Sequence, residues 1–309
     1  MWQTETFTGS FNAPINNEGN IYFTAEGSVQ HKLEKNWEAD TSKNSAILDC
    51  TLFQLFSSTR LNQTDTLQFT AGRAFTSDLS GLVFAQPSDG VLVKYANPRI
   101  DCTVYGGYSG LQNSKNVSIL TSKGVVWAPE DEKDLYDFAA PYANGSLCLS
   151  FPYLFLNQTI SIEGMGVWNV SGPADLSDDD KRIYGTLLLT GPLSNVLFYT
   201  ASATMQTEDF GDKSLLGQLG LNAFLPWKNS TINLKGIYAS GEKSGLKPFV
   251  GFTKQTACGS RSEPVLSGVA KFGGSASILP VDLIYLSAGV DAVYKLGDDS
   301  TEYYGTQVT

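Results

Sequence analysis

Ionisable side chains occur in the strand-like segments of this chain, in the polar rows that alternate with apolar residues. In "DLIYLSAGVDAVYKL" (282–296), Asp291 and Lys295 alternate with apolar Val290, Ala292 and Tyr294. Successive side chains of a β-strand face opposite sides, so each segment has one polar face. Opposed acids and bases on such a face could orient small polar solutes, or they could neutralise one another along a solvated wall. Nine residues are candidates to line a solute path: Glu26, Lys32, Asp49, Lys94, Asp101, Glu163, Lys235, Lys271 and Asp291.

A second group of acids lies in "WAPEDEKDLYDFAAPY" (127–142). Pro129 followed by three acids is typical of a helix start, and Leu135, Phe138 and Ala139 could form a short apolar stripe. We expect this segment to fold into a constriction, and the alternative is an exposed acidic loop. The constriction would bring together Glu130, Asp131, Glu132, Asp134 and Asp137.

Arg73 is a charge in an otherwise apolar row that includes Phe69. Because a charge on an apolar surface is costly, its position calls for a partner. Gly72 indicates a β-bulge that turns Arg73 inward. Asp78 or Asp89 could then pair with Arg73 and anchor the outer loop, and solute binding by Arg73 is the alternative.

Residues that could perform catalysis are scarce. His31 is the only histidine, and no nucleophile elbow, Walker loop or pair of metal ligands occurs. "DDDKR" (178–182) lacks the glycine turn and distal Glu of a calcium loop and is interpreted as solvated charge. We therefore expect no catalytic activity, no metal and no cofactor.

The cysteines and the overall charge narrow the function classes further. Cys50, Cys102, Cys148 and Cys258 form no CxxC pair, which disfavours zinc and leaves three disulfide connectivities open. The net charge of −10 argues against a nucleic-acid partner. No run of apolar residues approaches the roughly 18 of a transmembrane helix. The strand pattern begins at once, so we expect the chain to start after processing or inside a longer chain.

The elements that carry these side chains are predicted to be β-strands. Segments such as 19–33, 159–170 and 214–227 alternate as 282–296 does. The chain holds about fifteen such segments, several near the roughly 9–11 residues that a tilted strand needs to cross a bilayer.

The connections alternate between short and long. Short ones such as 16–20, 61–66 and 96–99 are rich in Asn, Pro, Gly or Asp, as tight turns require. Long ones include 33–45 and the loop 110–145. Antiparallel up-and-down strands would place all short turns at one end of the sheet and all long loops at the other. A soluble sandwich would need Greek-key crossovers and a bulky apolar interior, which this pattern disfavours.

The segment 67–111 resembles porin-type outer-membrane barrels of spirochaetes and other Gram-negative bacteria. The resemblance rests on Gly72-Arg73, Ser77-Asp78, Gly81, Pro87 and Asp89-Gly90. It implies a barrel with long outer loops. The chain differs from such barrels in ending on "EYYGTQVT" without a terminal aromatic residue, and in its odd strand count. We therefore expect it to be truncated at one or both ends.

The sequence predicts a single domain over 1–309, an antiparallel up-and-down transmembrane β-barrel of about 14–16 strands in a bacterial outer membrane. The expected function is a channel for small polar solutes or ions. The alternatives are a barrel-anchored adhesin whose loops bind external ligands, and a soluble extracellular β-sandwich. The expected partners are the lipid bilayer, small polar solutes and the outer-membrane barrel-assembly machinery, and a homo-oligomer is left open.

Overall fold

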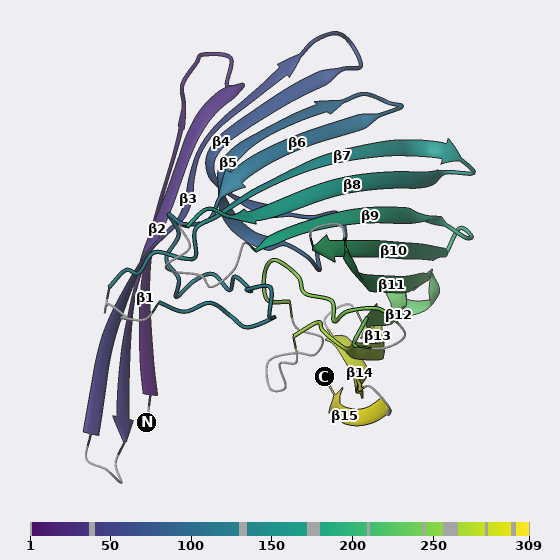
Figure 1. Cartoon of the computed structure of the whole chain (residues 1–309). Helices are drawn as coiled ribbons and strands as arrows, with labels where there is room; N and C mark the ends of the chain where they lie inside the picture. Colours follow the sequence, from purple (N-terminus) through teal and green to yellow (C-terminus); the bar gives the residue numbers. More distant parts are fainter. Residues whose placement is uncertain are drawn as a thin grey trace.

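The computed structural model describes residues 2–36, 41–129, 135–171, 180–208, 211–242, 245–255, 265–281, 284–297 and 301–308. These residues form one 15-stranded sheet in which every strand pairs antiparallel with its neighbours in the sequence. The predicted all-β, up-and-down topology is therefore confirmed, and the strand number lies within the predicted range. Figure 1 shows the sheet curving around a hollow through which several loops run.

The strands follow one another in chain order. The first eight are β1 (Trp2–Pro14), β2 (Ile21–Asn36), β3 (Thr41–Arg60), β4 (Thr66–Ser77), β5 (Ala85–Ala96), β6 (Asp101–Tyr108), β7 (Tyr142–Phe155) and β8 (Gln158–Asn169). The others are β9 (Lys181–Pro192), β10 (Leu197–Glu208), β11 (Asp212–Leu225), β12 (Ser230–Ala239), β13 (Val269–Val281), β14 (Ile284–Leu296) and β15 (Thr301–Val308). A 3-10 turn, η1 (Trp227–Asn229), joins β11 to β12. No helix among the described residues has the length and apolar character to cross a lipid bilayer.

The sheet is not closed into a barrel. Within the described residues, β1 pairs with β2 alone and β15 with β14 alone, and Figure 1 shows β1 and β15 lying apart. The strand directions supply a physical reason: each consecutive pair is antiparallel, so β1 and β15 run the same way. These two edges cannot pair antiparallel with each other. The predicted closure is therefore absent from the structure.

The short turns form as the sequence predicts. The Asn62 side chain accepts hydrogen bonds from the backbone N–H groups of Thr64 and Asp65, both at 2.9 Å. Asn97 accepts two in the same way, from Arg99 and Ile100 at 2.8 Å. Such Asx turns explain why Asn is frequent between these strands.

The connections at the other end differ from the prediction. The expected long loop 33–45 is mostly strand, because β2 extends to Asn36 and β3 begins at Thr41. The connections 209–211 and 297–300 at the same end are also as short as turns. The four longest connections, 78–84, 109–141, 170–180 and 240–268, nevertheless all leave this end of the sheet.

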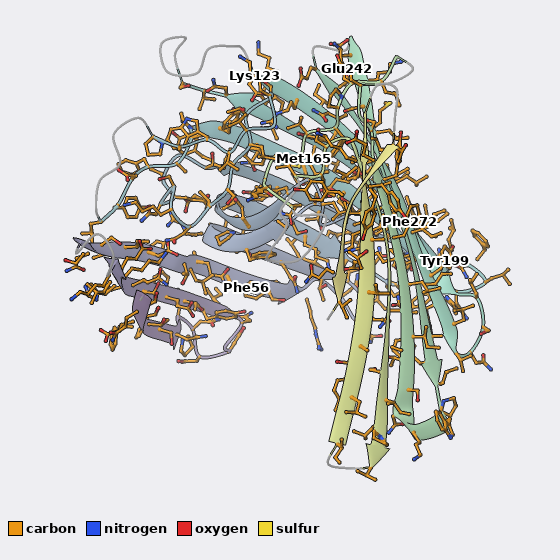
Figure 2. All side chains as sticks on the ribbon, turned by 90° about the horizontal axis from the view of Figure 1, so that it is seen from below. Phe56, Lys123, Met165, Tyr199, Glu242 and Phe272 are labelled. Atoms are coloured by element: carbon orange, nitrogen blue, oxygen red, sulfur yellow. The ribbon has the colours of Figure 1, made fainter. Side chains whose placement is uncertain are left out.

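The two faces of the sheet differ in their side chains. The convex face carries exposed large apolar residues on strand after strand, and in Figure 2 Phe272 and Tyr199 lie on this outer side whereas Met165 lies on the inner one. Register assigns one such residue from each of β4–β14 to the convex face: Phe69, Val91, Val104, Leu147, Ile162, Leu187, Met205, Leu219, Leu234, Phe272 and Val290. The alternation predicted from the sequence thus separates an apolar convex face from a concave face that carries both polar and apolar side chains.

Candidate functional site: loops packed on the concave face

Three of the long connections fold back onto the concave face of the sheet. We call their described parts (78–84, 109–129, 135–141, 240–242, 245–255 and 265–268) the inner cluster. Their apolar side chains form one buried core together with side chains from β6–β14. The loops contribute Val83, Phe84, Ile119, Ala139, Phe249 and Phe252, and the sheet contributes Tyr105, Met165, Tyr184, Leu216, Ile237, Val269 and Val293.

Aromatic contacts join two of the three loops, 78–84 and 240–268, to each other and to the sheet. The ring of Phe252 lies 5.3 Å from that of Phe84 and 5.6 Å from that of Tyr142. The ring of Phe249 lies 6.2 Å from that of Tyr184 in β9. Edge-to-face arrangements at such distances are favourable for aromatic pairs. The protein's hydrophobic core therefore lies inside the hollow, between loops and sheet.

Arg182 at the start of β9 holds two of these loops together. Its side chain is fully buried and donates hydrogen bonds to the carbonyl oxygens of Gly251 and Leu120 at 2.8 and 2.7 Å. Its Nε atom lies 2.9 Å from a carboxylate oxygen of Asp180. The other oxygen of Asp180 accepts hydrogen bonds from the Tyr142 hydroxyl at 2.7 Å and the Ser122 N–H at 3.0 Å.

The contacts of Asp180 and Arg182 with the loops were not predicted from the sequence. Asp180 and Arg182 belong to the segment 178–182 that was interpreted as solvated charge, yet Asp180 is only 6% exposed and Arg182 0%. The interpretation is wrong for these two residues because the loops from elsewhere in the chain cover them. Asp178 and Asp179 lie outside the described residues. Buried charges that are paired and hydrogen-bonded are tolerated, whereas removing one partner is strongly destabilising.

Further polar contacts fasten the 240–268 connection to β9–β11. The Tyr184 hydroxyl donates to the Val250 carbonyl at 2.8 Å. The Gln206 side-chain oxygen accepts from the Val250 N–H and from the Ser214 hydroxyl, both at 2.8 Å. Polar side chains at the loop end of the concave face thus satisfy loop backbone groups that would otherwise be buried without partners.

Of the two partners predicted for Arg73, Asp89 is the one that binds it. Arg73 makes a two-pronged contact with Asp89, with both N–O distances at 2.8 Å, and donates to the carbonyls of Cys50 and Leu111. Asp78 does not pair with Arg73. Its carboxylate accepts from the backbone N–H groups of Val83 and Phe84 at 3.0 and 2.8 Å and so shapes the 78–84 loop.

The predicted bulge at Gly72 is not present. Register is continuous through Gly72, which pairs with Gln54 and Gly90. Gly72 instead has φ +117°, and a Cβ atom there would lie 2.0 Å from the Phe53 carbonyl oxygen. Only glycine adopts this conformation without strain. The β3–β4 pairing ends one residue later, at Phe53 and Arg73.

Register puts all nine predicted solute-path residues on the polar side of their strands, but in different surroundings. Lys271 and Asp291 form an ion pair at 2.8 Å, and Glu26 accepts a hydrogen bond from Thr51. Glu163 is buried beneath the inner cluster, where it accepts the Leu79 N–H at 2.6 Å. The remaining residues are partly buried or exposed on β2, β3, β5, β6 and β12: Lys32, Asp49, Lys94, Asp101 and Lys235.

Lys32 and Asp49 lie apart from the rest. They occupy the section of β2 and β3 beyond the last β3–β4 pair, where only β1–β3 continue. The structure therefore does not bring these two residues to the same wall as Lys271 and Asp291.

The predicted constriction segment is described only in part. Glu130, Asp131, Glu132 and Asp134 lie outside the described residues. Asp137 is buried and lies 3.6 Å from the Lys115 amine. Residues 135–139 are not helical, because Phe138 forms an isolated β-bridge with Asn113. The predicted helix is therefore wrong for its described part.

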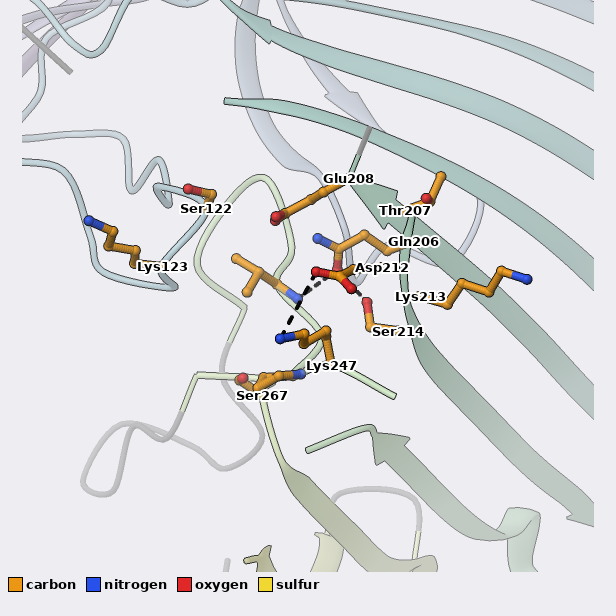
Figure 3. A pocket seen from close by; sticks show the side chains of 12 residues that line it. Ser122, Lys123, Gln206, Thr207, Glu208, Asp212, Lys213, Ser214, Lys247 and Ser267 are labelled. Atoms are coloured by element: carbon orange, nitrogen blue, oxygen red, sulfur yellow. Dashed lines mark hydrogen bonds and ion pairs between the residues drawn. The ribbon is translucent and has the colours of Figure 1, made fainter. Parts of the chain in front are cut away.

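Charged side chains gather at one cavity that the sequence reading did not single out. It has a volume of about 250 Å³ and lies beside the β10–β11 hairpin (Figure 3). Lys123, Lys213 and Lys247 line it together with Glu208 and Asp212. The Lys247–Asp212 pair spans 4.0 Å and both side chains are more than half exposed, so it contributes little stability. The mixed charges favour no single ligand class.

Among the described residues, cysteine and metal chemistry add no further candidate site. Cys50, Cys102 and Cys148 are free thiols, and Cys258 lies outside the described residues. Within the part of the chain that the structure describes, no three His, Cys, Asp or Glu side chains are grouped to hold a metal ion.

No model of a known protein family matches this chain, and no curated protein matches it as a relative.

Proposed function

We propose that the protein is an outer-membrane channel that admits small polar solutes along a path narrowed by the inner cluster. The observation that carries the proposal is the apolar convex face. Exposed large apolar side chains recur on the outer side of successive strands, whereas soluble monomers rarely expose contiguous apolar patches larger than a few hundred Å². Such a face needs an apolar environment, and a lipid bilayer supplies one around a whole sheet.

Strand length and topology support the same proposal. The strands β4, β5, β8, β9 and β10 have 12 residues each. A tilted strand needs roughly 9–11 residues to cross a bilayer. Short turns at one end and the longest loops at the other are typical of outer-membrane barrels.

Insertion requires that the edges of the sheet be paired, because unpaired N–H and C=O groups are not tolerated in lipid. The proposal therefore includes closure in the membrane. Since β1 and β15 run in the same direction, they would pair directly as parallel strands or through an added strand antiparallel to both.

The inner cluster limits what could pass. Its apolar core fills the hollow against β6–β14, so a wide aqueous pore is not expected. The concave face of β2–β4 contributes no side chain to that core among the described residues. The solute path is therefore proposed to run between the inner cluster and this uncovered face.

Planar-bilayer recording of the purified chain, with its detergent requirement and heat-shifted gel migration measured in parallel, tests the proposal. We expect a detergent-dependent protein, heat-shifted migration and small, discrete conductance steps. Insertion without conductance would overturn the channel and support a barrel that only anchors its loops. Solubility without detergent would overturn membrane insertion and support a soluble β-domain.

A further inference from the structure

A second cavity lies on the uncovered part of the concave face. It has a volume of about 290 Å³ and is formed by side chains of β2–β6. Ligand pockets in proteins begin at about this size. The residues that line it include Tyr22, Gln54, Phe56, Thr70, Ser88 and Tyr105.

Aromatic surfaces form part of its wall. Tyr22 in β2 stacks on Phe56 in β3, with ring centroids 4.7 Å apart and an angle of 29° between the rings. Tyr105 in β6 is buried and fixed by a hydrogen bond from its hydroxyl to Ser88. These faces suit a ligand with an apolar surface, such as the C–H face of a sugar ring.

Polar groups without partners lie beside these rings. The Tyr22 hydroxyl, the Gln54 amide and the Thr70 hydroxyl are partly buried, and none makes a hydrogen bond in the part of the chain that the structure describes. Together they offer both donors and acceptors. Because these groups have no protein partner among the described residues, each is available to form a hydrogen bond with a ligand that supplies several hydroxyls.

The cavity also discriminates by charge. None of the described residues that line it is charged, in contrast with the cavity of Figure 3. Arg73 and Asp89, which adjoin lining residues, neutralise each other in an ion pair at 2.8 Å, so a charged ligand would lose hydration there without gaining a free opposite charge. A neutral ligand avoids that loss.

We propose that this cavity binds a neutral, polyhydroxylated ring solute, that is, an uncharged sugar. The proposal deepens the proposed function, because it assigns a substrate class to the path along the uncovered face. In this arrangement the stacked Tyr22 and Phe56 rings hold one face of the sugar, and Gln54 and Thr70 bind its hydroxyls.

Titration calorimetry of the full chain in detergent micelles tests the site without requiring conductance. Glucose and sucrose are the probes, and glucose 6-phosphate and uridine are the comparison ligands. Phe56→Leu removes the ring face, and Gln54→Leu removes the amide. Phe224→Leu is the matched control, because Phe224 pairs with Phe198 on a distant hairpin and lies outside the cavity. Heat-shifted gel migration verifies that each variant is folded.

The expected result is measurable glucose or sucrose binding, weakened by about three- to tenfold in Phe56→Leu and Gln54→Leu and unchanged in Phe224→Leu. Absence of sugar binding, equal binding by all folded variants, or tighter binding of glucose 6-phosphate or uridine would each overturn the proposal. Sugar binding without bilayer conductance would overturn the channel alone, and conductance without sugar binding would overturn this site alone.

Discussion

The concave face of the sheet has two walls that differ in what they contact. We call the concave face of β7–β14 the covered wall and that of β2–β4 the open wall. The covered wall presents Tyr184, Leu216 and Ile237 to the inner cluster, and these side chains are buried. The open wall presents Tyr22, Gln54 and Thr70, which are only partly buried and face the neutral cavity.

This difference shows that one strand pattern supports two kinds of surface. Both walls alternate against the same apolar convex face. The covered wall carries large apolar residues at its loop end, where loops return to it, and polar residues such as Lys271 and Asp291 farther along the strands. Stability is therefore expected to depend on the covered wall, and ligand binding on the open wall.

The largest expected effect follows from removing the Arg182 anchor of the covered wall. Arg182→Leu leaves Asp180 buried without its partner, so we expect the free energy of unfolding to fall by about 3–5 kcal/mol. Denaturant unfolding measures this, and limited proteolysis should show earlier cleavage within 109–141 and 240–268. Arg60→Leu, at an exposed position, is the control and should behave as the unaltered protein. Equal stability of the two variants would contradict the anchor.

A second prediction addresses the convex face that both walls share. Val290→Arg places a charge on that face, which would cost about 2–4 kcal/mol at the bilayer midplane. Insertion into liposomes should fall, as measured by flotation and heat-shifted gel migration. Asp291→Asn, one residue away on the concave face, should insert normally. If the two variants insert equally well, the assignment of the faces is wrong.

A third prediction concerns the backbone conformation of Gly72 in β4, at the boundary of the open wall. Gly72→Ala forces a side chain onto φ +117° and against the Phe53 carbonyl, so we expect a loss of about 1–3 kcal/mol in unfolding free energy. Chemical denaturation gives the value. Gly185→Ala is a matched control, because no atom lies within 4 Å of the added Cβ. A smaller loss for Gly72→Ala than for Gly185→Ala would contradict the geometry.

A smaller effect is expected at the polar end of the covered wall. Asp291→Asn removes the negative charge 2.8 Å from Lys271, so the local charge becomes more positive. We expect stability to change by less than about 1 kcal/mol, since the pair is partly exposed. In a KCl gradient the reversal potential should move toward the chloride potential. A move toward the potassium potential would contradict the placement of this pair on the concave, lumen-facing side of the sheet.

The smallest effect is expected at the short turn between β3 and β4, beyond the end of the open wall. Hydrogen bonds from Thr64, Tyr95 and Asn62 lower the pKa of Asp65. Its contribution to stability is therefore present above the unfolded pKa and is lost as pH falls through the lower, folded pKa. NMR titration should show the Asp65 carboxyl titrating below its ordinary range, and Asp65→Asn should remove this acid-dependent component. Titration at or above the ordinary value would contradict the turn geometry.

Several features could be predicted because they depend on neighbours along the chain. Strand alternation, antiparallel hairpins and Asn-rich turns are local, so residues such as Asn62 and Asn97 predicted their own turns. A charge in an apolar row needs a partner, so the sequence predicts that Arg73 pairs with one of two nearby acids, Asp78 or Asp89. The choice of Asp89 could not be made from sequence, since it depends on the β4–β5 register and on Asp78 being taken up by its own loop.

Local sequence patterns are enough to predict the all-β class, the up-and-down order and the two faces of each strand, because these follow from a period of two and from turn chemistry. The folded structure was needed to show that the sheet is open and that Asp180 and Arg182 are buried. It also decided which concave residues lie under loops and which line the neutral cavity. These features arise from contacts between segments far apart in the chain, and no local periodicity encodes them.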